Sequence, residues 1–237
     1  MIYEIAGLRI DLQNKYEYTD RFCAEYLSDD QTSPAHLSAC VSNEEFLQEK
    51  MQSPDFSDGY IENICLYRKI CLQLPAFKRM LLHCAVLEYQ GKGYAFLGKS
   101  GTGKSTHARL WKEYLSTPRM INGDKPILEY TRDGFIAHGT PWKGKEGWGN
   151  KMFAPLNGLC FLEQAKENSI EKLTPSQASK RVFSQVLLPK DEQNAVATLE
   201  LVDKLVSTTP AYLLKCDISK QAVNLAVEAL TGEEHED

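Results

Sequence analysis

A glycine-rich segment of eight residues constrains this chain of 237 residues more than any other feature. Residues 98–105 read Gly-Lys-Ser-Gly-Thr-Gly-Lys-Ser and fit the pattern G-x-x-x-x-G-K-[S/T] at every fixed position. The apolar run Tyr94–Leu97 precedes the segment, and residues 106–115 follow with helical spacing. Glycines let a backbone turn its N–H groups inward, and a helix N-terminus adds positive potential. This strand–loop–helix order is therefore typical of a nucleotide-binding P-loop.

The chemistry of a P-loop predicts a role for each of its polar residues. We expect Lys104 to reach the β- and γ-phosphates, the Ser105 hydroxyl to ligate Mg²⁺, and the backbone amides of Ser100–Lys104 to surround the β-phosphate. The predicted nucleotide-binding residues of the loop are Gly98, Ser100, Gly101, Thr102, Gly103, Lys104, Ser105 and Thr106. The cofactors that this loop predicts are ATP and Mg²⁺. The alternative is a glycine-rich turn that carries an exposed lysine.

A second anchor for metal and substrate is predicted about 19 residues after Ser105. There an apolar run, Met120–Asn122, ends in Gly123-Asp124. A carboxylate at the end of a strand can hold a metal ion and accept a proton from a substrate hydroxyl. Asp124 is therefore the candidate base and the second candidate metal ligand, with a simple turn before Pro126 as the alternative.

Together these segments resemble a known family. The run Leu82-His83-Cys84-Ala85-Val86, the P-loop and Ile121–Asp124 resemble the catalytic core of HPr kinase/phosphorylase. A structural relative of that core is the nucleotide domain of ATP-dependent phosphoenolpyruvate carboxykinase. The resemblance covers roughly residues 80–165. We therefore expect an α/β fold: a phosphoenolpyruvate carboxykinase-like P-loop core of mixed sheet flanked by helices, with a small N-terminal α+β portion.

The resemblance also implies roles for particular residues. It implies a phosphoryl-transfer role for Asp124 and a position near the phosphates for His83, so that the candidate catalytic residues are Asp124, His83 and Lys104. Members of the family carry a pair of aspartates where this chain has Gly123-Asp124. The glycine-and-arginine signature loop of HPr kinases has no counterpart here. From its residue type alone, His83 would instead be a histidine of the core or of a sheet edge.

Two further segments carry candidate residues. Lys143 and Lys145 flank Gly144, and such a loop is expected to fold over a phosphate and neutralise charge in the transition state. The alternative is a solvated surface turn. Glu163 and Gln164 end another apolar strand and are candidates for contacting metal or substrate.

Patterns of turn and apolar residues predict the organisation of the chain. Residues 1–79 are expected to form the small N-terminal α+β portion and residues 80–237 the nucleotide-binding domain. Other expected elements are strand-like pieces at 1–10 and 16–22, a turn-rich stretch at 28–34, a helical region over 43–82 interrupted at Pro75, one strand over 80–89, helices over 176–188, 191–206 and 219–230, and a frayed acidic tail at 232–237.

Composition excludes several classes of protein. Lys and Arg number 27 against 32 Asp and Glu, so the net charge is −5, which disfavours general nucleic-acid binding. No apolar run approaches the ~20 residues that span a bilayer. The first residues do not resemble a secretory signal, so a cytoplasmic protein without membrane partners is expected. Seven scattered cysteines without a CxxC pair predict reduced thiols rather than a zinc site.

The function that these patterns favour is an ATP- and Mg²⁺-dependent kinase acting on a hydroxyl. The acceptor would be a serine in a protein or peptide, or a small hydroxylated metabolite. Two alternatives stay open: a nucleotide-sensing regulatory module that binds ATP without transferring phosphate, and a carboxykinase-like lyase, which needs a larger substrate lobe. Because relatives in the HPr kinase family assemble, a homo-oligomer is also among the expectations.

Overall fold

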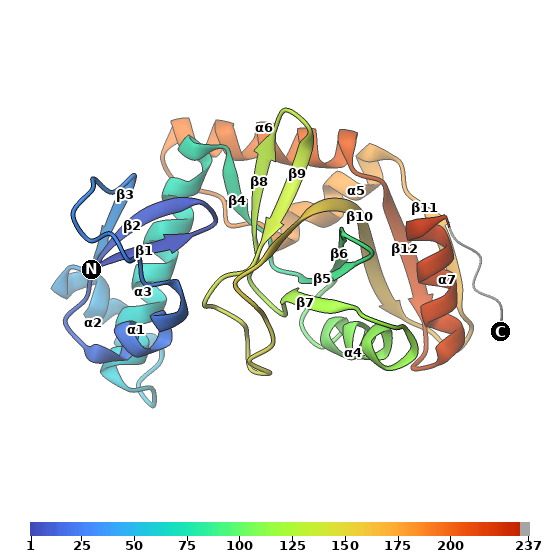
Figure 1. Ribbon diagram of the computed structural model, residues 1–237, viewed down its shortest axis with the longest axis horizontal. Helices are drawn as coiled ribbons and strands as arrows, with labels where there is room; N and C mark the ends of the chain where they lie inside the picture. Colours follow the sequence, from blue (N-terminus) through green and yellow to red (C-terminus); the bar gives the residue numbers. More distant parts are fainter. Residues whose placement is uncertain (233–237) are drawn as a thin grey trace.

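The computed structural model describes residues 1–232; the rest of the acidic tail, 233–237, lies outside the described residues. The described chain contains a three-stranded sheet near the N-terminus and a nine-stranded mixed sheet that carries helices on both faces (Figure 1). The predicted α/β class, with a mixed sheet flanked by helices, is confirmed. No helix in this part of the chain combines the length and apolar character of a membrane span. All seven cysteines are free, as expected.

The small sheet and three helices form what we call the N-terminal unit, residues 2–73. Its strands, in the order β1–β2–β3, are β1 (Ile2–Ile5), β2 (Leu8–Gln13) and β3 (Leu37–Cys40). Its helices are α1 (Glu17–Phe22), α2 (Asn43–Gln52) and α3 (Asp58–Gln73), with a short 3₁₀ turn, η1 (Ala24–Tyr26), after α1. Strands β1 and β2 pair antiparallel across a tight turn, whereas β3 pairs parallel with β2. Strand β3 was not predicted.

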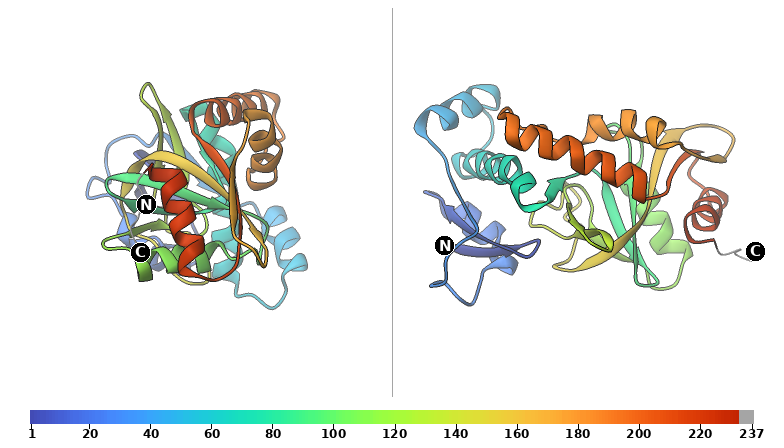
Figure 2. Two further views of the ribbon diagram at one scale, coloured as in Figure 1. Left: turned by 90° about the vertical axis from the view of Figure 1, so that its right-hand side faces the viewer. Right: turned by 90° about the horizontal axis from the view of Figure 1, so that it is seen from above.

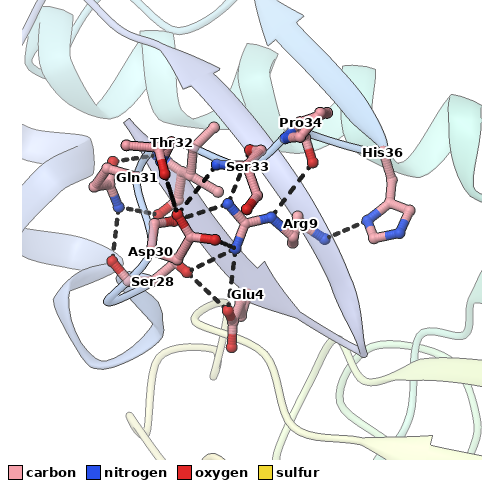
Figure 3. A network of polar contacts seen from close by, with 10 residues as sticks. Glu4, Arg9, Ser28, Asp30, Gln31, Thr32, Ser33, Pro34 and His36 are labelled. Carbon is pink, nitrogen blue, oxygen red and sulfur yellow. Dashed lines mark hydrogen bonds and ion pairs between the residues drawn. The ribbon is translucent and has the colours of Figure 1, made fainter.

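Arg9 holds the turn-rich stretch that connects η1 to β3 (Figure 3). Its guanidinium donates hydrogen bonds to the backbone oxygens of Asp30 and Ser33, at 2.8 and 2.9 Å, and to the Ser28 hydroxyl at 3.2 Å. The side chains of Glu4 and Asp30 lie 3.6 Å from the same guanidinium. One arginine therefore donates to backbone carbonyl groups of a loop that has no regular strand or helix pairing to satisfy them.

The strand predicted over 16–22 is wrong, because this segment is helix α1. The reason lies far along the chain. The buried carboxylate of Glu62, on α3, accepts hydrogen bonds from the backbone N–H groups of Lys15 and Tyr16 at 2.8 and 3.0 Å. The first N–H groups of a helix have no partner within it, and here Glu62 of another helix accepts from the N-cap residue Tyr16 and from Lys15 before it. Tyr18 and Phe22 then stack one helical turn apart.

The helical region predicted over 43–82 is two helices rather than one. Helix α2 ends at Gln52, because Pro54 disfavours helical backbone in the residue before it. Helix α3 begins after Ser57, whose side chain caps it. Pro75 lies in a short 3₁₀ turn, η2 (Leu74–Phe77), so that the predicted interruption at this residue is confirmed.

The large sheet runs in the order β4-β8-β9-β10-β6-β5-β7, with β12 paired to β10 and β11 paired to β12. Its strands are β4 (Arg79–Leu81), β5 (Ala85–Tyr89), β6 (Lys92–Leu97), β7 (Arg119–Asn122), β8 (Ile127–Thr131), β9 (Gly134–His138), β10 (Phe153–Gln164), β11 (Ser169–Lys172) and β12 (Ala211–Cys216). The long strand β10 joins the two halves: its first residues pair with β9, and its later residues pair with β6 and β12. Strand β11 was not predicted.

Helices cover both faces of this sheet (Figure 2). They are α4 (Lys104–Tyr114), α5 (Pro175–Val182), α6 (Glu192–Thr208) and α7 (Lys220–Thr231), with a 3₁₀ turn, η3 (Phe183–Gln185), after α5. Helices α5 and α6 pack on one apolar layer, and α4 and α7 pack on the other. Residues alternate along β6, so that Ala95 and Leu97 enter the first layer while Tyr94 and Phe96 enter the second. This burial on both faces makes β6 a rigid support for the loop that follows it.

The single strand predicted over 80–89 is divided into β4 and β5, which occupy different parts of the sheet. Residues 82–84 between them bond elsewhere: the Leu82 N–H donates to Pro126, and the His83 N–H donates to Gln185 at 2.8 Å. The predicted helix over 176–188 is also too long, because Val186 forms a bridge with Leu82. Each of these partners is distant in sequence, so local apolar pattern did not reveal the break.

Arg79 joins the N-terminal unit to the large sheet. Its guanidinium donates to the backbone oxygens of Ala6 and Phe77, at 2.8 and 2.7 Å, and pairs with Glu129 at 2.7 Å. His138 lies 2.8 Å from the other Glu129 oxygen. One apolar cluster also crosses this junction, since Trp142 packs with residues of the N-terminal unit. The predicted domain division at 79/80 stays a prediction.

We expect Arg79→Met to lower the free energy of unfolding by about 1–3 kcal/mol, because it removes the bonds to two backbone oxygens and one of the two basic partners of the partly buried Glu129 carboxylate. Urea unfolding measures this change. Arg132→Ala is the control, since Arg132 lies on the same β8–β9 hairpin with a side chain that is 92% exposed. Its effect is expected to stay within ~0.5 kcal/mol. Equal effects of the two substitutions would contradict the role given to Arg79.

Candidate active site

The predicted functional segments meet at one edge of the large sheet. Strand β10 runs parallel to β6, and β5 is antiparallel to both β6 and β7, so β6, β7 and β10 all point the same way. The P-loop follows β6, Asp124 follows β7, and Gln164 ends β10. Strand β5 begins at this same edge, just after His83. The topology thus brings together residues that are up to 81 positions apart in sequence, from His83 to Gln164.

The P-loop has the predicted strand–loop–helix order, which is confirmed: β6 ends at Leu97 and α4 begins at Lys104. Gly103 precedes the helix with a φ of 99°, a conformation that side chains other than glycine rarely adopt. Gly98 admits no side chain, because a Cβ there would meet the Thr102 side chain. Ser105 and Thr106 lie in the first turn of α4, where backbone N–H groups are free for an anion.

The Lys104 side chain lies over the loop that precedes it. Its ammonium group donates to the backbone oxygens of Gly98 and Lys99, at 2.9 and 3.3 Å. Burial lowers the pKa of Lys104, while the negative charge of Asp124 acts in the opposite direction. Lys104 is therefore held as a buried group at the loop, within electrostatic reach of Asp124.

Asp124 lies between two basic side chains. One carboxylate oxygen is 3.0 Å from His83 Nε2, and the other is 2.7 Å from the Lys125 ammonium. Burial alone would raise the pKa of Asp124, but the hydrogen bonds and charges of His83 and Lys125 outweigh it and bring the pKa below its usual value. The structure thus brings together His83, Asp124 and Lys104, the three candidate catalytic residues, with Asp124 ionised.

A buried asparagine that the sequence analysis did not single out holds the Asp124 turn in place. The Asn122 Oδ1 atom accepts from the backbone N–H groups of Asp124 and Lys125, at 2.9 and 2.7 Å. Its Nδ2 atom donates to the backbone oxygen and the hydroxyl of Thr140, at 3.2 and 3.0 Å. The sequence signal was present: a polar Asn at the end of an apolar strand, directly before Gly-Asp.

The segment 140–149, which we call the 140s loop, packs directly on this turn. The Gly123 N–H donates to the Trp148 backbone oxygen at 2.8 Å. A Cβ on Gly123 would lie 3.1 Å from that oxygen and 3.3 Å from the Lys143 oxygen. A Cβ on Gly144 would lie 2.7 Å from the Asp124 Cβ. Backbone of the 140s loop therefore occupies the space next to Gly123, where the resemblance predicts a first aspartate.

The two lysines of the 140s loop differ in their surroundings. The Lys143 ammonium pairs with Glu25 of the N-terminal unit at 2.6 Å. Lys145 is exposed. The predicted role of Lys143 and Lys145 over the phosphates therefore stays a prediction, and for Lys143 it requires the ion pair with Glu25 to open.

Glu163 and Gln164 lie at the same sheet edge, on the other side of the P-loop. Glu163 pairs with Arg181 at 2.8 Å, and the Gln164 side chain donates to the Gly101 backbone oxygen at 3.1 Å. Gln164 therefore supports the loop tip. Glu163 has a cationic partner from α5 and is not joined to Asp124 by any contact in the described chain.

The two predicted metal ligands offer oxygen atoms, which suit magnesium better than a soft metal. Ser105 and Asp124 offer a hydroxyl and a carboxylate, and Mg²⁺ is usually held by one or two such oxygens together with substrate phosphates and water. Among residues 1–232, no group of three or more His, Cys, Asp or Glu side chains is arranged to hold a metal ion. Ser105 and Asp124 stay the predicted ligands.

Comparison with known families gives one assignment. A family model described as SynChlorMet cassette protein ScmC matches residues 60–224, more than half of the chain. The chain belongs to the ScmC family. The part matched to ScmC begins near the start of α3 and contains the P-loop, Asp124 and the 140s loop. Residues 1–59 precede it.

Comparison with solved structures gives a remote similarity. A structure of the Hpr(Ser) kinase/phosphatase from Coxiella burnetii is similar with a TM-score of 0.36 and 10% sequence identity, over 65% of this chain and 88% of that chain. No curated protein matches the sequence. The family shown is thus ScmC, and the α/β assignment of this member rests on its own sheet and helices.

The packing of the 140s loop on Asp124 predicts a difference between two glycines with positive φ. Gly144→Ala adds a methyl group against the Asp124 side chain, whereas Gly147→Ala has open space around it. We expect Gly147→Ala to cost about 1 kcal/mol of unfolding free energy from backbone strain. Gly144→Ala should cost about 1–3 kcal/mol more, because the added carbon overpacks the turn. Urea unfolding of both variants measures the difference, and equal costs would show that the loop does not press on Asp124 in solution.

Proposed function

We propose that this chain is an ATP- and Mg²⁺-dependent kinase that transfers the γ-phosphate to a hydroxyl group. The acceptor is a serine of a protein or peptide, or a small hydroxylated metabolite. The observation that carries the proposal is the convergence of Lys104 and Asp124 at one sheet edge, with His83 bonded to Asp124. The proposed setting is the cytoplasm, and a homo-oligomer remains part of the proposal.

The roles follow from the contacts. Backbone N–H groups of the P-loop and the first turn of α4 bind the phosphates, and Lys104 supplies a positive charge to the β- and γ-phosphates. Ser105 and Asp124 hold Mg²⁺, which neutralises phosphate charge when bound. Asp124 accepts a hydrogen bond from the acceptor hydroxyl and takes its proton.

The electrostatics around Asp124 suit this role in a particular way. A carboxylate whose pKa is lowered is a weak base, so its main contribution is to orient the hydroxyl. Phosphoryl transfer depends mostly on such positioning and on charge stabilisation, because little proton transfer is needed early in the reaction. His83 keeps the carboxylate in one orientation through the 3.0 Å contact.

One observation favours a second candidate, a sensor that binds ATP without transferring phosphate. Only one carboxylate stands at the end of β7, and the 140s loop packs where a second would lie. Incubation with [γ-³²P]ATP, Mg²⁺ and a panel of seryl peptides and hydroxylated metabolites separates the two functions. Labelled acceptor supports the kinase, and tight ATP binding without labelled acceptor or ADP formation supports the sensor.

Lys104→Ala is expected to weaken ATP binding and abolish phosphate transfer, because the phosphates lose their main cation. Isothermal titration calorimetry measures the affinity. Lys92→Ala is the matched control, since Lys92 is an exposed lysine at the opposite end of the same strand, β6. Unchanged ATP affinity in Lys104→Ala would overturn the assignment of the nucleotide site.

Asp124→Asn keeps the shape of the side chain but removes its charge and basicity. We expect kcat to fall about 10²–10⁴-fold, because the neutral amide neither orients the acceptor hydroxyl as a carboxylate does nor takes its proton, with a smaller loss of ATP affinity. Asp133→Asn, on an exposed hairpin turn, is the control and should leave kcat unchanged. Full activity of Asp124→Asn would assign the role to another residue, with Glu163 the next to test.

The lowered pKa of Asp124 also predicts the pH profile. Asp124 acts in its ionised form, which is lost only as the pH falls through a pKa below the ordinary 3.8. Protonation of Asp124 is therefore expected to cause no loss of kcat between pH 8 and pH 5, measured for as long as the protein stays folded by circular dichroism. An acidic limb in this range that disappears in Asp124→Asn would contradict the lowered pKa.

A further inference from the structure

The N-terminal unit reaches the candidate active site through one tryptophan. Trp142, in the 140s loop, is 6% exposed and its Nε1 atom donates to Asn63 Oδ1 on α3 at 3.1 Å. The Asn63 Nδ2 atom in turn donates to the Thr19 hydroxyl on α1 at 3.3 Å. The Trp142 ring packs on Tyr67 and Phe22, with ring centroids 4.7 and 6.5 Å away. Trp142 is thus seated among side chains of the N-terminal unit, although it belongs to the other part of the chain.

The residues on both sides of Trp142 contact the Asp124 turn. Thr140, two residues before it, bonds Asn122 and also donates from its hydroxyl to the Lys125 backbone oxygen at 2.8 Å. Gly144, two residues after it, lies against the Asp124 side chain. A shift or rotation of Trp142 therefore moves the two contacts that flank the carboxylate.

Two further contacts join the N-terminal unit to the same region. Glu25 pairs with Lys143 at 2.6 Å, directly next to Trp142. The Tyr67 ring lies 5.7 Å from the Lys125 ammonium, which is itself bonded to Asp124. The negative charge of Asp124 also contributes to raising the pKa of Tyr67 above its ordinary value, after burial, which is the largest cause. Side chains of the N-terminal unit therefore contact the 140s loop and lie next to the cation beside Asp124.

From this geometry we propose that Trp142 is a positioning residue, held by Asn63, through which the N-terminal unit fixes the 140s loop and the orientation of Asp124. The kinetic part of this inference rests on the proposed kinase function, but the structural part does not. The contacts described for Trp142 do not involve the P-loop. Loss of the hydrogen bond between Trp142 and Asn63 is therefore expected to lower kcat and to leave the KM for ATP unchanged.

The test uses three variants of the full chain and one control. Trp142→Phe keeps an aromatic ring but removes the donor, Asn63→Leu removes the acceptor, and the double variant removes both. Tyr3→Phe is the matched control, because it removes one side-chain hydrogen bond of a buried aromatic residue of the N-terminal unit, from Tyr3 to Asp20 at 2.9 Å, that does not involve the 140s loop. Hydrogen–deuterium exchange reports on the loop whether or not phosphate is transferred.

The amides of Gly123 and Asn150 are the most informative probes, since they bond the Trp148 and Ile121 backbone oxygens. In each single variant we expect exchange at 121–125 and 143–150 to become about fivefold faster, the factor that corresponds to one typical buried hydrogen bond. Asn63→Leu also removes the bond to Thr19, so the double variant is compared with Asn63→Leu: its increase should be no larger, because the bond between Trp142 and Asn63 is already lost there. Tyr3→Phe should leave exchange in these segments unchanged.

Kinetics give the second readout. With a labelled acceptor in hand, kcat of Trp142→Phe and Asn63→Leu should fall about tenfold with an unchanged KM for ATP, whereas Tyr3→Phe keeps both values. Unchanged exchange in the 140s loop, or an equal increase in Tyr3→Phe, would overturn the proposal. If the wild-type chain transfers no phosphate, the kinase function fails, and the exchange result still decides the positioning role.

Discussion

The fully satisfied amide of Asn122 is the interaction on which the candidate site depends. An asparagine side chain offers two donor hydrogens and two acceptor lone pairs, and here all four are used. Two bonds shape the turn that presents Asp124, and two bonds reach Thr140 in the 140s loop. Because Asn122 is completely buried, water cannot bond any of these groups, and leaving one of them unpaired would destabilise the fold. One side chain therefore couples the end of β7 to a segment nearly twenty residues later.

The sheet then determines what this turn faces. Strands β6 and β7 point the same way with β5 between them, so the P-loop, the Asp124 turn and the start of β5 share an edge. Basic side chains lie around Asp124 at this edge: Lys125 pairs with it, His83 is 3.0 Å away, and the buried Lys104 is within electrostatic reach. Such an arrangement keeps Asp124 ionised and leaves the N-terminus of α4 free to favour an anion. A nucleotide phosphate and a divalent cation complement this set of charges.

The N-terminal unit is joined to the rest of the chain by polar as well as apolar contacts. Arg79 bonds Ala6 and Glu129, and the indole of Trp142 bonds Asn63. An apolar cluster that includes Trp142 and residues from both parts accompanies these contacts. The ScmC family match begins near the start of α3, which carries Asn63 and Tyr67. Most of helix α3 therefore lies in the part of the chain that the ScmC family model covers, although its sheet partners lie in the N-terminal unit.

Local pattern in the sequence determined the P-loop, the strand before it, the helix after it and the importance of Asp124. Each of these features depends on residues that are neighbours in the chain: glycines that allow a turn, an apolar run, and a carboxylate at a strand end. The resemblance implied a position near the phosphates for His83, whereas its contact with Asp124 was seen only in the structure. Tertiary structure decided the rest, because the deciding partners are remote in sequence. Glu62 accepts from the N–H groups at the start of helix α1. Gln185 and Pro126 bond the residues that separate β4 from β5. Glu25 pairs with the Lys143 ammonium. A hydrogen bond or ion pair between distant segments leaves no periodic trace in either one, so only the folded chain could show it.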